Sequence, residues 1–451
     1  MSMRIALRAC CALAFLAITV QATAYPPPPK PEEPYQTAWM KQLGTSEPDW
    51  ATGVAGDGQG NVYLAGMTLG SLAGPNIGGE DAFLYKYDGQ GSLLWQRQFG
   101  TAAHDSASCA CADPAGNAIV AGTTFGALGG PNAGYIDAFV AKYSPSGEQL
   151  WARQVGTLQE DGVGSVSTDR QGNIYFCGST SGSLGGPSAG LKDVFFGKYD
   201  PAGNLLWMKQ MGTDRYDTAG RIRADDHGNV YLLGNTQGSI GAPNSGQNDL
   251  FLCKLDPSGD LVWVRQVGTP DNDTNGGLAL DGRGSIYFTG QTGAALGGPS
   301  WGGQDFCLFK YDENGGLVWS RQFGTSLSDA IMSIAVDYTG KLFLGGYTWG
   351  SFGEPVAGRM DILLARVDTD GTLEWTRQFG SSENDFPRAI CGGIGEIYLC
   401  GITVGSLAAP NQGGDDAFLI KFVPEPAMLF GLALGAAAIL RRHSRKPSDP
   451  M

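Results

Sequence analysis

Seven tryptophans stand at equal intervals along the chain, and this spacing restricts the fold more than any other feature. Each follows the previous one by 56 residues, and a series of seven aspartates keeps the same interval. The two series are Trp39, Trp95, Trp151, Trp207, Trp263, Trp319 and Trp375, and Asp49, Asp105, Asp161, Asp217, Asp273, Asp329 and Asp385. A fixed period of this length is the signature of a repeat architecture. We therefore expect seven copies of one structural unit.

Each copy predicts four short strands. In the first copy they span about 51–56, 61–67, 82–87 and 93–99, and the turns D-G-Q-G-N and D-G-Q-G are typical of antiparallel hairpins. Strand sequences such as V-Y-L-A are apolar on both faces, so both faces of the sheet must be covered. Four-stranded sheets packed between like neighbours and repeated seven times indicate an all-β fold, a seven-bladed β-propeller.

The two ends of the repeat region predict how the ring closes. The last copy stops after 417–422 without a fourth strand, whereas residues 37–44 resemble a fourth strand with no blade before it. We expect the N-terminal strand to complete blade seven, because this removes an open sheet edge.

The N-terminus has the features of a secretory signal peptide. Arg4 and Arg8 precede a short apolar run, and Ala22 and Ala24 form an A-x-A site after it. Cleavage is expected after Ala24, and this predicts an exported protein. The alternative is a buried first helix.

Near the C-terminus three parts follow one another: Pro424, Glu425 and Pro426, an apolar run over 427–440, and a basic cluster that begins with Arg441 and Arg442. This order resembles the PEP-CTERM sorting signal of Gram-negative bacteria. The resemblance implies an exosortase-type membrane protease as a partner, which would remove the tail at or near the Pro-Glu-Pro motif. The alternative is a plain C-terminal membrane anchor. The protein is then expected at the cell surface or outside the cell, held transiently or permanently in the inner membrane by its C-terminus.

The repeat itself resembles the bacterial β-propeller repeat family known as SBBP. The resemblance rests on K-Y-D-P-A-G-N-L-L-W at 198–207 and G-N-V-Y-L-A-G at 60–66, and it extends over 37–422. It implies a propeller in an exported protein and no shared catalytic residues. Copy seven departs from the pattern, since C-G-G-I-G-E replaces the D-x-x-G-N turn, and we expect its first hairpin to be distorted.

The expected organisation is a signal peptide over 1–24, a proline-rich spacer over 25–36, the propeller over 37–422 and a sorting segment over 423–451. Without the signal and the residues after the sorting motif, the formal net charge falls from −14 to about −19. This acidity argues against nucleic acid and anionic membrane surfaces as partners.

Strand order places the interblade loops and the long loops between second and third strands on one end of the ring, the candidate binding face. This long-loop face carries the Asp49 series and a second series, Asp81, Asp137, Asp193, Asp249, Asp305, Asp361 and Asp416. Two rings of carboxylates could gather Ca²⁺. We favour a structural role, in which each aspartate accepts hydrogen bonds from its own loop, and expect no cofactor.

Catalytic residues are scarce. The sequence has three histidines, of which His104 stands alone on the long-loop face, and no G-x-S-x-G motif accompanies it. Tyr135, Trp301 and Trp349 are aromatics in long loops where other copies have Gly, Ser or Asn. Such rings suit sugar stacking, and loop packing is the alternative.

The first functional hypothesis is a noncatalytic surface or matrix protein that binds extracellular polysaccharide or an envelope protein. The second is an exported glycan hydrolase or lyase that uses carboxylates, which would show a deep, asymmetric acidic pocket at the axis. The third is a calcium-stabilised spacer.

Overall fold

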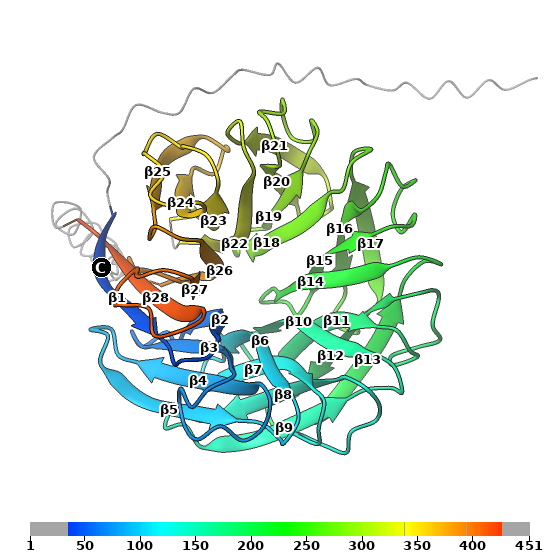
Figure 1. Ribbon diagram of the computed structural model, residues 1–451. Helices are drawn as coiled ribbons and strands as arrows, with labels where there is room; N and C mark the ends of the chain where they lie inside the picture. Colours follow the sequence, from blue (N-terminus) through cyan, green and yellow to red (C-terminus); the bar gives the residue numbers. More distant parts are fainter. Residues whose placement is uncertain (1–34, 338, 394, 426–451) are drawn as a thin grey trace, which may run out of the picture.

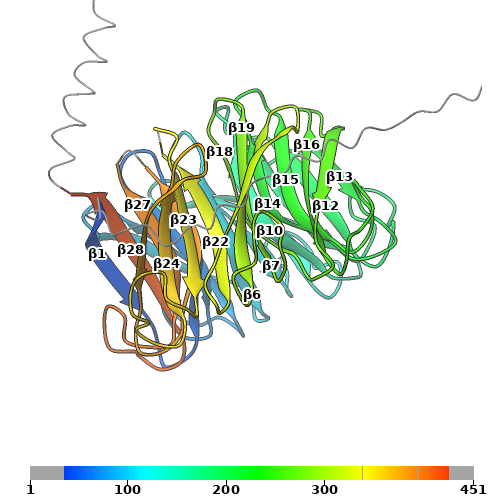
Figure 2. The same ribbon diagram turned by 90° about the horizontal axis from the view of Figure 1, so that it is seen from above.

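The computed structural model describes residues 35–337, 339–393 and 395–425, and every element in them is a β-strand. The strands form seven four-stranded antiparallel sheets around a central axis (Figure 1). Seen from above, the loops gather at the two ends of the blades (Figure 2). The predicted all-β, seven-bladed propeller is confirmed. The predicted signal site with Ala22 and Ala24, and the tail with Pro426, Arg441 and Arg442, lie outside the described residues.

The strands of the first four blades are as follows. Blade one has β2 (Asp49–Gly56), β3 (Val62–Thr68), β4 (Asp81–Tyr87) and β5 (Leu93–Phe99). Blade two has β6 (Asp105–Ala112), β7 (Ala118–Thr124), β8 (Asp137–Tyr143) and β9 (Gln149–Val155). Blade three has β10 (Asp161–Thr168), β11 (Ile174–Thr180), β12 (Asp193–Tyr199) and β13 (Leu205–Met211). Blade four has β14 (Asp217–Ala224), β15 (Val230–Thr236), β16 (Asp249–Leu255) and β17 (Leu261–Val267).

The remaining blades follow the same plan. Blade five has β18 (Thr274–Leu280), β19 (Ser285–Thr292), β20 (Asp305–Asp312) and β21 (Leu317–Phe323). Blade six has β22 (Asp329–Val336), β23 (Leu342–Thr348), β24 (Asp361–Val367) and β25 (Leu373–Phe379). Blade seven has β26 (Asp385–Gly392), β27 (Ile397–Thr403), β28 (Asp416–Pro424) and, from the other end of the chain, β1 (Tyr35–Leu43).

The ring closes where β1 pairs with β28, as predicted. The antiparallel register runs from Tyr35 opposite Pro424 to Leu43 opposite Ala417. The closing pair is therefore longer than expected at one end, where β1 begins inside the predicted spacer and β28 includes the first residue of the sorting motif. One physical reason is the Tyr35 ring, which packs 5.1 Å from Phe343 of blade six between ring centroids.

The core lies between neighbouring sheets. Between blades one and two, for example, Tyr63, Leu84, Val120 and Phe139 are fully buried in one cluster. Since each sheet is covered on both faces, its second and third strands are buried along nearly their whole length, as the apolar sequences of these strands predict.

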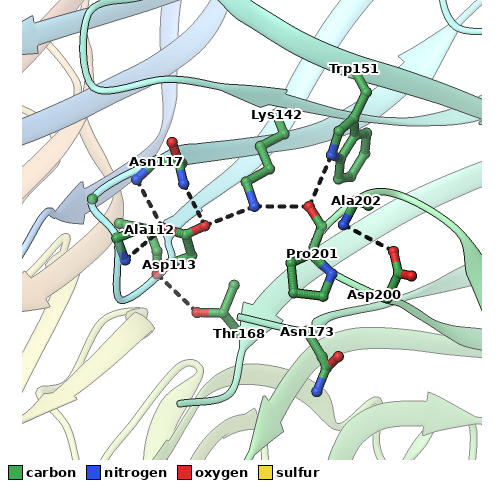
Figure 3. A network of polar contacts seen from close by, with 12 residues as sticks. Ala112, Asp113, Asn117, Lys142, Trp151, Thr168, Asn173, Asp200, Pro201 and Ala202 are labelled. Carbon is green, nitrogen blue, oxygen red and sulfur yellow. Dashed lines mark hydrogen bonds and ion pairs between the residues drawn. The ribbon is translucent and has the colours of Figure 1, made fainter. Parts of the chain in front are cut away.

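A polar network joins most blades to the next through side chains of the repeat (Figure 3). The Lys142 ammonium of blade two lies 2.9 Å from the Asp113 carboxylate, in the first hairpin turn of the same blade. It also donates to the carbonyl of Pro201 in blade three, and the Trp151 indole donates to the same carbonyl at 3.2 Å. Five other tryptophans of the series make the corresponding bond, namely Trp39, Trp95, Trp207, Trp263 and Trp319.

Blade seven departs from this pattern where the sequence does. Its first hairpin is closed by a hydrogen bond from the Gly393 amide to the Glu396 carbonyl, one residue shorter than the pair from Asp57 to Asn61 in blade one. The turn aspartate is missing, and the Glu396 carboxylate takes its place 2.5 Å from the Lys421 ammonium. The expected change in this hairpin is therefore accompanied by a replacement of the lost ion pair.

Candidate functional site: the axial cavity and the long-loop face

The first strands of the blades lie nearest the axis (Figure 1), and six of them line a cavity of about 420 Å³. Most of its wall is small or hydroxylic, with Gly53, Ser108, Gly164, Ser165 and Ser333 among the lining residues. A register shift interrupts each of these strands near its middle, as between Ala51 and Gly53. The small side chains leave room at the axis, which larger residues would fill.

Three arginines stand out in this small-residue wall. Arg221 and Arg223 come from β14 of blade four, and Arg388 comes from β26 of blade seven. The positions that pair in the same register as Arg221 hold Gly53, Cys109, Ser165, Ser333 and Ala389. The positions that match Arg223 hold Ala55, Cys111, Ser167, Ala279, Ala335 and Cys391. The arginines therefore break the sevenfold symmetry of the axial wall.

The hydrogen bonds of these arginines go to backbone carbonyls. Arg221 Nη1 donates to Gly220 and Nη2 reaches across to Met332 of blade six, both at 2.8 Å. Arg223 Nη1 donates to Ile222 at 2.8 Å. Within the described residues, the lining of the cavity includes no aspartate or glutamate, and no ion pair forms with Arg221, Arg223 or Arg388.

Burial and mutual repulsion act on the charges at the axis. Burial lowers the pKa of Arg223, and both burial and the nearby charge of Arg223 lower the pKa of Arg221. The neighbouring Cys109 thiol supplies no balancing charge, because burial raises its pKa to about 12 despite the two arginines. A guanidinium stays protonated in proteins. The cavity is therefore a cationic chamber inside an acidic chain.

Two of the first strands carry an aromatic residue near their long-loop end, and one of these residues lines the cavity. Trp50, which lines the cavity, donates from its indole nitrogen to Asp415 in the long loop of blade seven at 2.8 Å. Phe386, beside Asp385 at the start of β26, contacts the Tyr347 ring at 6.3 Å between centroids. Both aromatics come from the second position of a first strand, where other copies have Ser, Gly, Thr or Ala.

On the long-loop face, His104 and Tyr135 are brought together by a third ring. Phe125 lies between them, 5.6 Å from His104 and 5.3 Å from Tyr135 between ring centroids, edge-on in both cases. Tyr135 is 62% exposed, and the His104 side chain is also exposed. Phe125 is held in place because its backbone amide donates to the His104 carbonyl. We call these three residues the aromatic cluster.

Trp301 and Trp349 do not join this cluster, since they belong to blades five and six on another part of the ring. Trp349 is 39% exposed, and its amide donates to the carbonyl of Ser328 in the interblade loop. Trp301 is half-buried, and its amide donates to Asp305 at 2.8 Å. Its indole nitrogen is buried without a partner in the described part of the chain.

The two aspartate series are fully buried and hydrogen-bonded to their own loops. In the first series, Asp105 accepts from the backbone amide and the hydroxyl of Thr101. In the second, Asp137 accepts from the amide of Ala133 and from the side chain of Gln154, which follows the repeat tryptophan Trp151 by three residues. These are the contacts that a loop-fixing role requires.

The two series also meet at each junction between blades. A Cβ added to Gly100 would lie within 3.0 Å of oxygens from both Asp81 and Asp105. The Oδ1 atoms of these two aspartates are buried and have no hydrogen-bond partner in the residues that the structure describes. Where the effect is resolved, as in Asp49 and Asp273, burial raises the pKa of the first-series carboxyl, and the second-series neighbour raises it further. No group of three or more metal-ligating side chains occurs in the described ranges.

The loop residues were found from the sequence because they differ between copies, but the axial arginines were missed. The same signal marks them, because alignment of the first strands puts Arg221 and Arg223 opposite small residues, and Arg388 opposite uncharged residues such as Thr52 and Met332. Only the fold shows that these strands share one cavity.

Comparison with known proteins agrees with this architecture. The SBBP beta-propeller repeat family matches residues 38–73, 150–185 and 318–353, and the PEP-CTERM protein-sorting motif matches residues 422–446. In the described residues, no helix is long and apolar enough to cross a membrane.

Two curated proteins are similar in sequence. The regulatory protein FlaEY of Caulobacter vibrioides is 29% identical over 231 residues, which are 46% of this chain and 23% of that protein. An uncharacterised WD repeat-containing protein of Acanthamoeba polyphaga mimivirus is 23% identical over 395 residues, 66% of this chain and 28% of that protein. The chain thus spans less than a third of each relative. Among solved structures, the WD40 propeller domain of Doa1 is 10% identical with a TM-score of 0.51, over 87% of this chain and 98% of that one. This likeness shows the fold alone.

Proposed function

We propose that this chain, which carries SBBP beta-propeller repeats and a PEP-CTERM protein-sorting motif, is an exported, noncatalytic binding scaffold of the cell surface or extracellular matrix. Extracellular polysaccharide is the ligand that its long-loop face suits best. The sorting motif supports export, and the exosortase-type protease that such motifs imply is the partner for processing.

The observation that carries the proposal is the aromatic cluster of His104, Phe125 and Tyr135. Its rings contact one another edge-on, and the outermost, Tyr135, is mostly exposed. Side chains that repeat in every copy are occupied in holding the loops, whereas this cluster occurs once. An exposed ring supported by others offers a flat apolar surface for sugar rings and a hydroxyl for hydrogen bonding.

The test is a glycan array and a pull-down from envelope polysaccharide with residues 25–425, once as wild type and once as Tyr135→Ala. We expect binding that falls about tenfold in the variant, which corresponds to the loss of about 1.4 kcal/mol. Leu158→Ala is the matched control, because Leu158 is 82% exposed on a neighbouring loop of the same face. Equal binding by all three proteins, or none at micromolar protein, would contradict a carbohydrate role for the cluster. Retention of an envelope protein in its place would favour the protein-binding form of the scaffold.

An exported glycan hydrolase or lyase is the second candidate. The axial cavity is asymmetric, as such an enzyme would need, but its described lining is basic rather than acidic. On the long-loop face, the carboxylates of the two aspartate series are fully buried and bonded to their loops. These features favour binding over carboxylate catalysis. Incubation with neutral and acidic polysaccharides should release no new reducing ends and no unsaturated sugar, and either product would overturn the noncatalytic assignment.

The calcium-stabilised spacer is the third candidate. The feature that supports it is the pairing of buried carboxylates, as at Asp81 and Asp105, whose Oδ1 atoms have no hydrogen-bond partner in the described residues. Calcium prefers six to eight oxygen ligands. A melting temperature that falls on addition of a chelator and recovers with calcium would support the spacer, and an unchanged value would argue against it.

Export and processing are tested separately by the intact mass of protein recovered from cells. We expect the mass of a chain that begins after Ala24 and ends near the Pro-Glu-Pro motif. A chain that retains residues 427–451 would favour a membrane anchor.

A further inference from the structure

We propose that the axial cavity binds a small oxyanion, a molecule with a carboxylate, phosphate or sulfate group, through Arg221, Arg223 and Arg388. The site is separate from the aromatic cluster, so this inference stands or falls independently of the carbohydrate proposal.

Within the described residues, Arg221 and Arg223 have no carboxylate as a counter-charge. Arg221 and Arg223 are half-buried, are two residues apart on β14, and contact backbone carbonyls rather than carboxylates. The lysines that are buried in the described chain each pair with a carboxylate, Lys86 with Asp57 at 3.1 Å, Lys142 with Asp113 at 2.9 Å and Lys421 with Glu396 at 2.5 Å. Adjacent like charges removed from solvent are costly unless an anion balances them.

The guanidinium groups of Arg221 and Arg223 have N–H donors that no hydrogen bond to a described residue uses. A guanidinium has five N–H donors. Two donors of Arg221 and one of Arg223 are used within the described residues. The planar arrangement of the rest suits the bidentate recognition of carboxylate, phosphate or sulfate oxygens.

The cavity has the volume and the polar lining of a small-molecule site. Its volume of about 420 Å³ is that of a small-molecule site, and Thr52, Ser108, Ser165 and Ser333 add hydroxyls to the lining. Arg388 enters from the opposite wall, on β26. An anion between blades four and seven would therefore meet guanidinium groups from two sides and hydroxyls from the others.

The other blades carry no arginine at the positions of Arg221 and Arg223. At the positions of Arg221 and Arg223 they have Gly, Ala, Ser or Cys, which fit the same backbone without a charge. The fold therefore does not require arginine at either position, and a ligand accounts for its presence in blade four.

The test compares residues 25–425 with the double variant Arg221→Ser and Arg223→Ala, which introduces residues that other blades carry at the same positions. Binding of sulfate, phosphate and citrate is measured by titration calorimetry and by melting temperature, at constant ionic strength set with chloride. We expect a saturable rise in the melting temperature of the wild type with at least one of these ions, and a loss of at least about tenfold in affinity in the double variant. Citrate alone would indicate a carboxylate ligand, and phosphate or sulfate a tetrahedral one.

Stability in chloride alone distinguishes a ligand site from a structural role. If the arginines serve a ligand, their removal leaves the melting temperature unchanged or raises it, because uncompensated charge is removed. Arg215→Ser, an exposed arginine of the loop before β14, is the control and should change neither readout. A wild type with no saturable response to the three ions, or a double variant with the same response as the wild type, would overturn the proposal.

A second measurement does not depend on the folding of the double variant. Arg388 is exposed and makes no ion pair within the described ranges, so Arg388→Gln should fold and bind the same ion more weakly. Crystals of the wild type soaked in selenate should show an anomalous peak between Arg221, Arg223 and Arg388, and a cavity without such a peak would contradict the assignment.

Discussion

The outer part of the propeller and its axial wall follow opposite rules. Around the outside, six fourth-strand tryptophans donate to a turn of the next blade, and at five of these junctions a lysine donates to the same carbonyl (Figure 3). At the axis, the first strands differ from copy to copy, and Arg221, Arg223 and Arg388 stand where other copies have uncharged residues. Both regions contain cations, and within the described residues buried outer lysines such as Lys142 pair with carboxylates, whereas the axial arginines do not.

This difference separates two tasks of one sequence. Contacts that recur at every junction hold neighbouring blades together, and their loss should reduce stability. Residues that occur in one blade only do not take part in these repeated contacts, so their loss should affect binding and leave the fold intact.

Removal of the closing strand should have the largest effect. Without β1, the edge of β28 is exposed, and Phe343 and Trp375 lose the Tyr35 ring that packs against them. We expect a chain of residues 44–425 to aggregate and to lose cooperative thermal unfolding, whereas a chain of residues 35–425 should remain monomeric. The measurements are size-exclusion chromatography and circular dichroism. Equal melting temperatures for the two chains would show that closure does not depend on β1.

Loss of one repeated ion pair should have the next largest effect. The side chains of Lys142 and Asp113 are 5% and 3% exposed, so Lys142→Met leaves a buried carboxylate without its cation. We expect a decrease of about 3–5 kcal/mol in the free energy of unfolding, measured with urea. Lys209→Met is the control, because its partner Asp260 is 72% exposed, and it should cost less than about 1 kcal/mol. Similar losses of stability in both variants would mean that the burial of an ion pair does not determine its contribution to the free energy of unfolding.

The two ends of the ring should respond to pH in opposite directions. At the long-loop end, burial raises the pKa of Asp329 to about 6 from 3.8, although hydrogen bonds from Thr348 and Thr325 partly offset it. At the turn end, burial alone would raise the pKa of Asp113, but hydrogen bonds from Lys142 and Asn117 outweigh it and lower the pKa.

The sign of each effect follows from which state holds the proton more tightly. The folded state holds the Asp329 proton more tightly, so the stability from this group is present below pH 3.8 and is lost as the pH rises to about 6. Asp329→Asn should remove this slope, which amounts to a decrease of about 2–3 kcal/mol in the free energy of unfolding of the wild type between pH 4 and pH 7. The Asp113 contribution is present above pH 3.8 and is lost as the pH falls below it. Urea unfolding from pH 4 to pH 7 measures the Asp329 slope, and an unchanged slope in the Asn variant would contradict its assignment.

The replacement ion pair of blade seven should have the smallest effect of the four. Glu396 and Lys421 are 21% and 8% exposed, so this pair is less buried than that of Lys142. We expect Glu396→Gln to cost about 1–2 kcal/mol in urea unfolding. Glu383→Gln, in an exposed interblade loop, should cost nothing measurable. If Glu396→Gln is as harmless, the shortened hairpin is not stabilised by this pair.

The architecture could be predicted from the sequence because it is periodic. The spacing of the tryptophans gave the number of blades, and the orphan strands at 37–44 and 417–422 gave the closure. The extra pairing of Tyr35 and Pro424 could not be predicted, because it depends on the packing of one ring against blade six. The contact of His104 and Tyr135 through Phe125 could not be predicted either, because sequence separation does not show how a long loop folds over its neighbour.

The axial arginines were missed for a different reason. Strand position alone did not show that the first strands enclose a cavity, since a propeller can fill its axis with side chains. The absence of large residues at six matching positions was visible in the sequence, but its meaning depends on the width of the ring.

Native-state hydrogen exchange of β1 is the most direct test of the claim that repeated contacts close a ring. We predict that the backbone amides of residues 36–43 that pair with β28 exchange as slowly as those of the buried strands β27 and β28, with the same dependence on denaturant. Exchange of these amides at the rate of the exposed loops, while β28 stays protected, would show that the ring is not closed by the N-terminal strand.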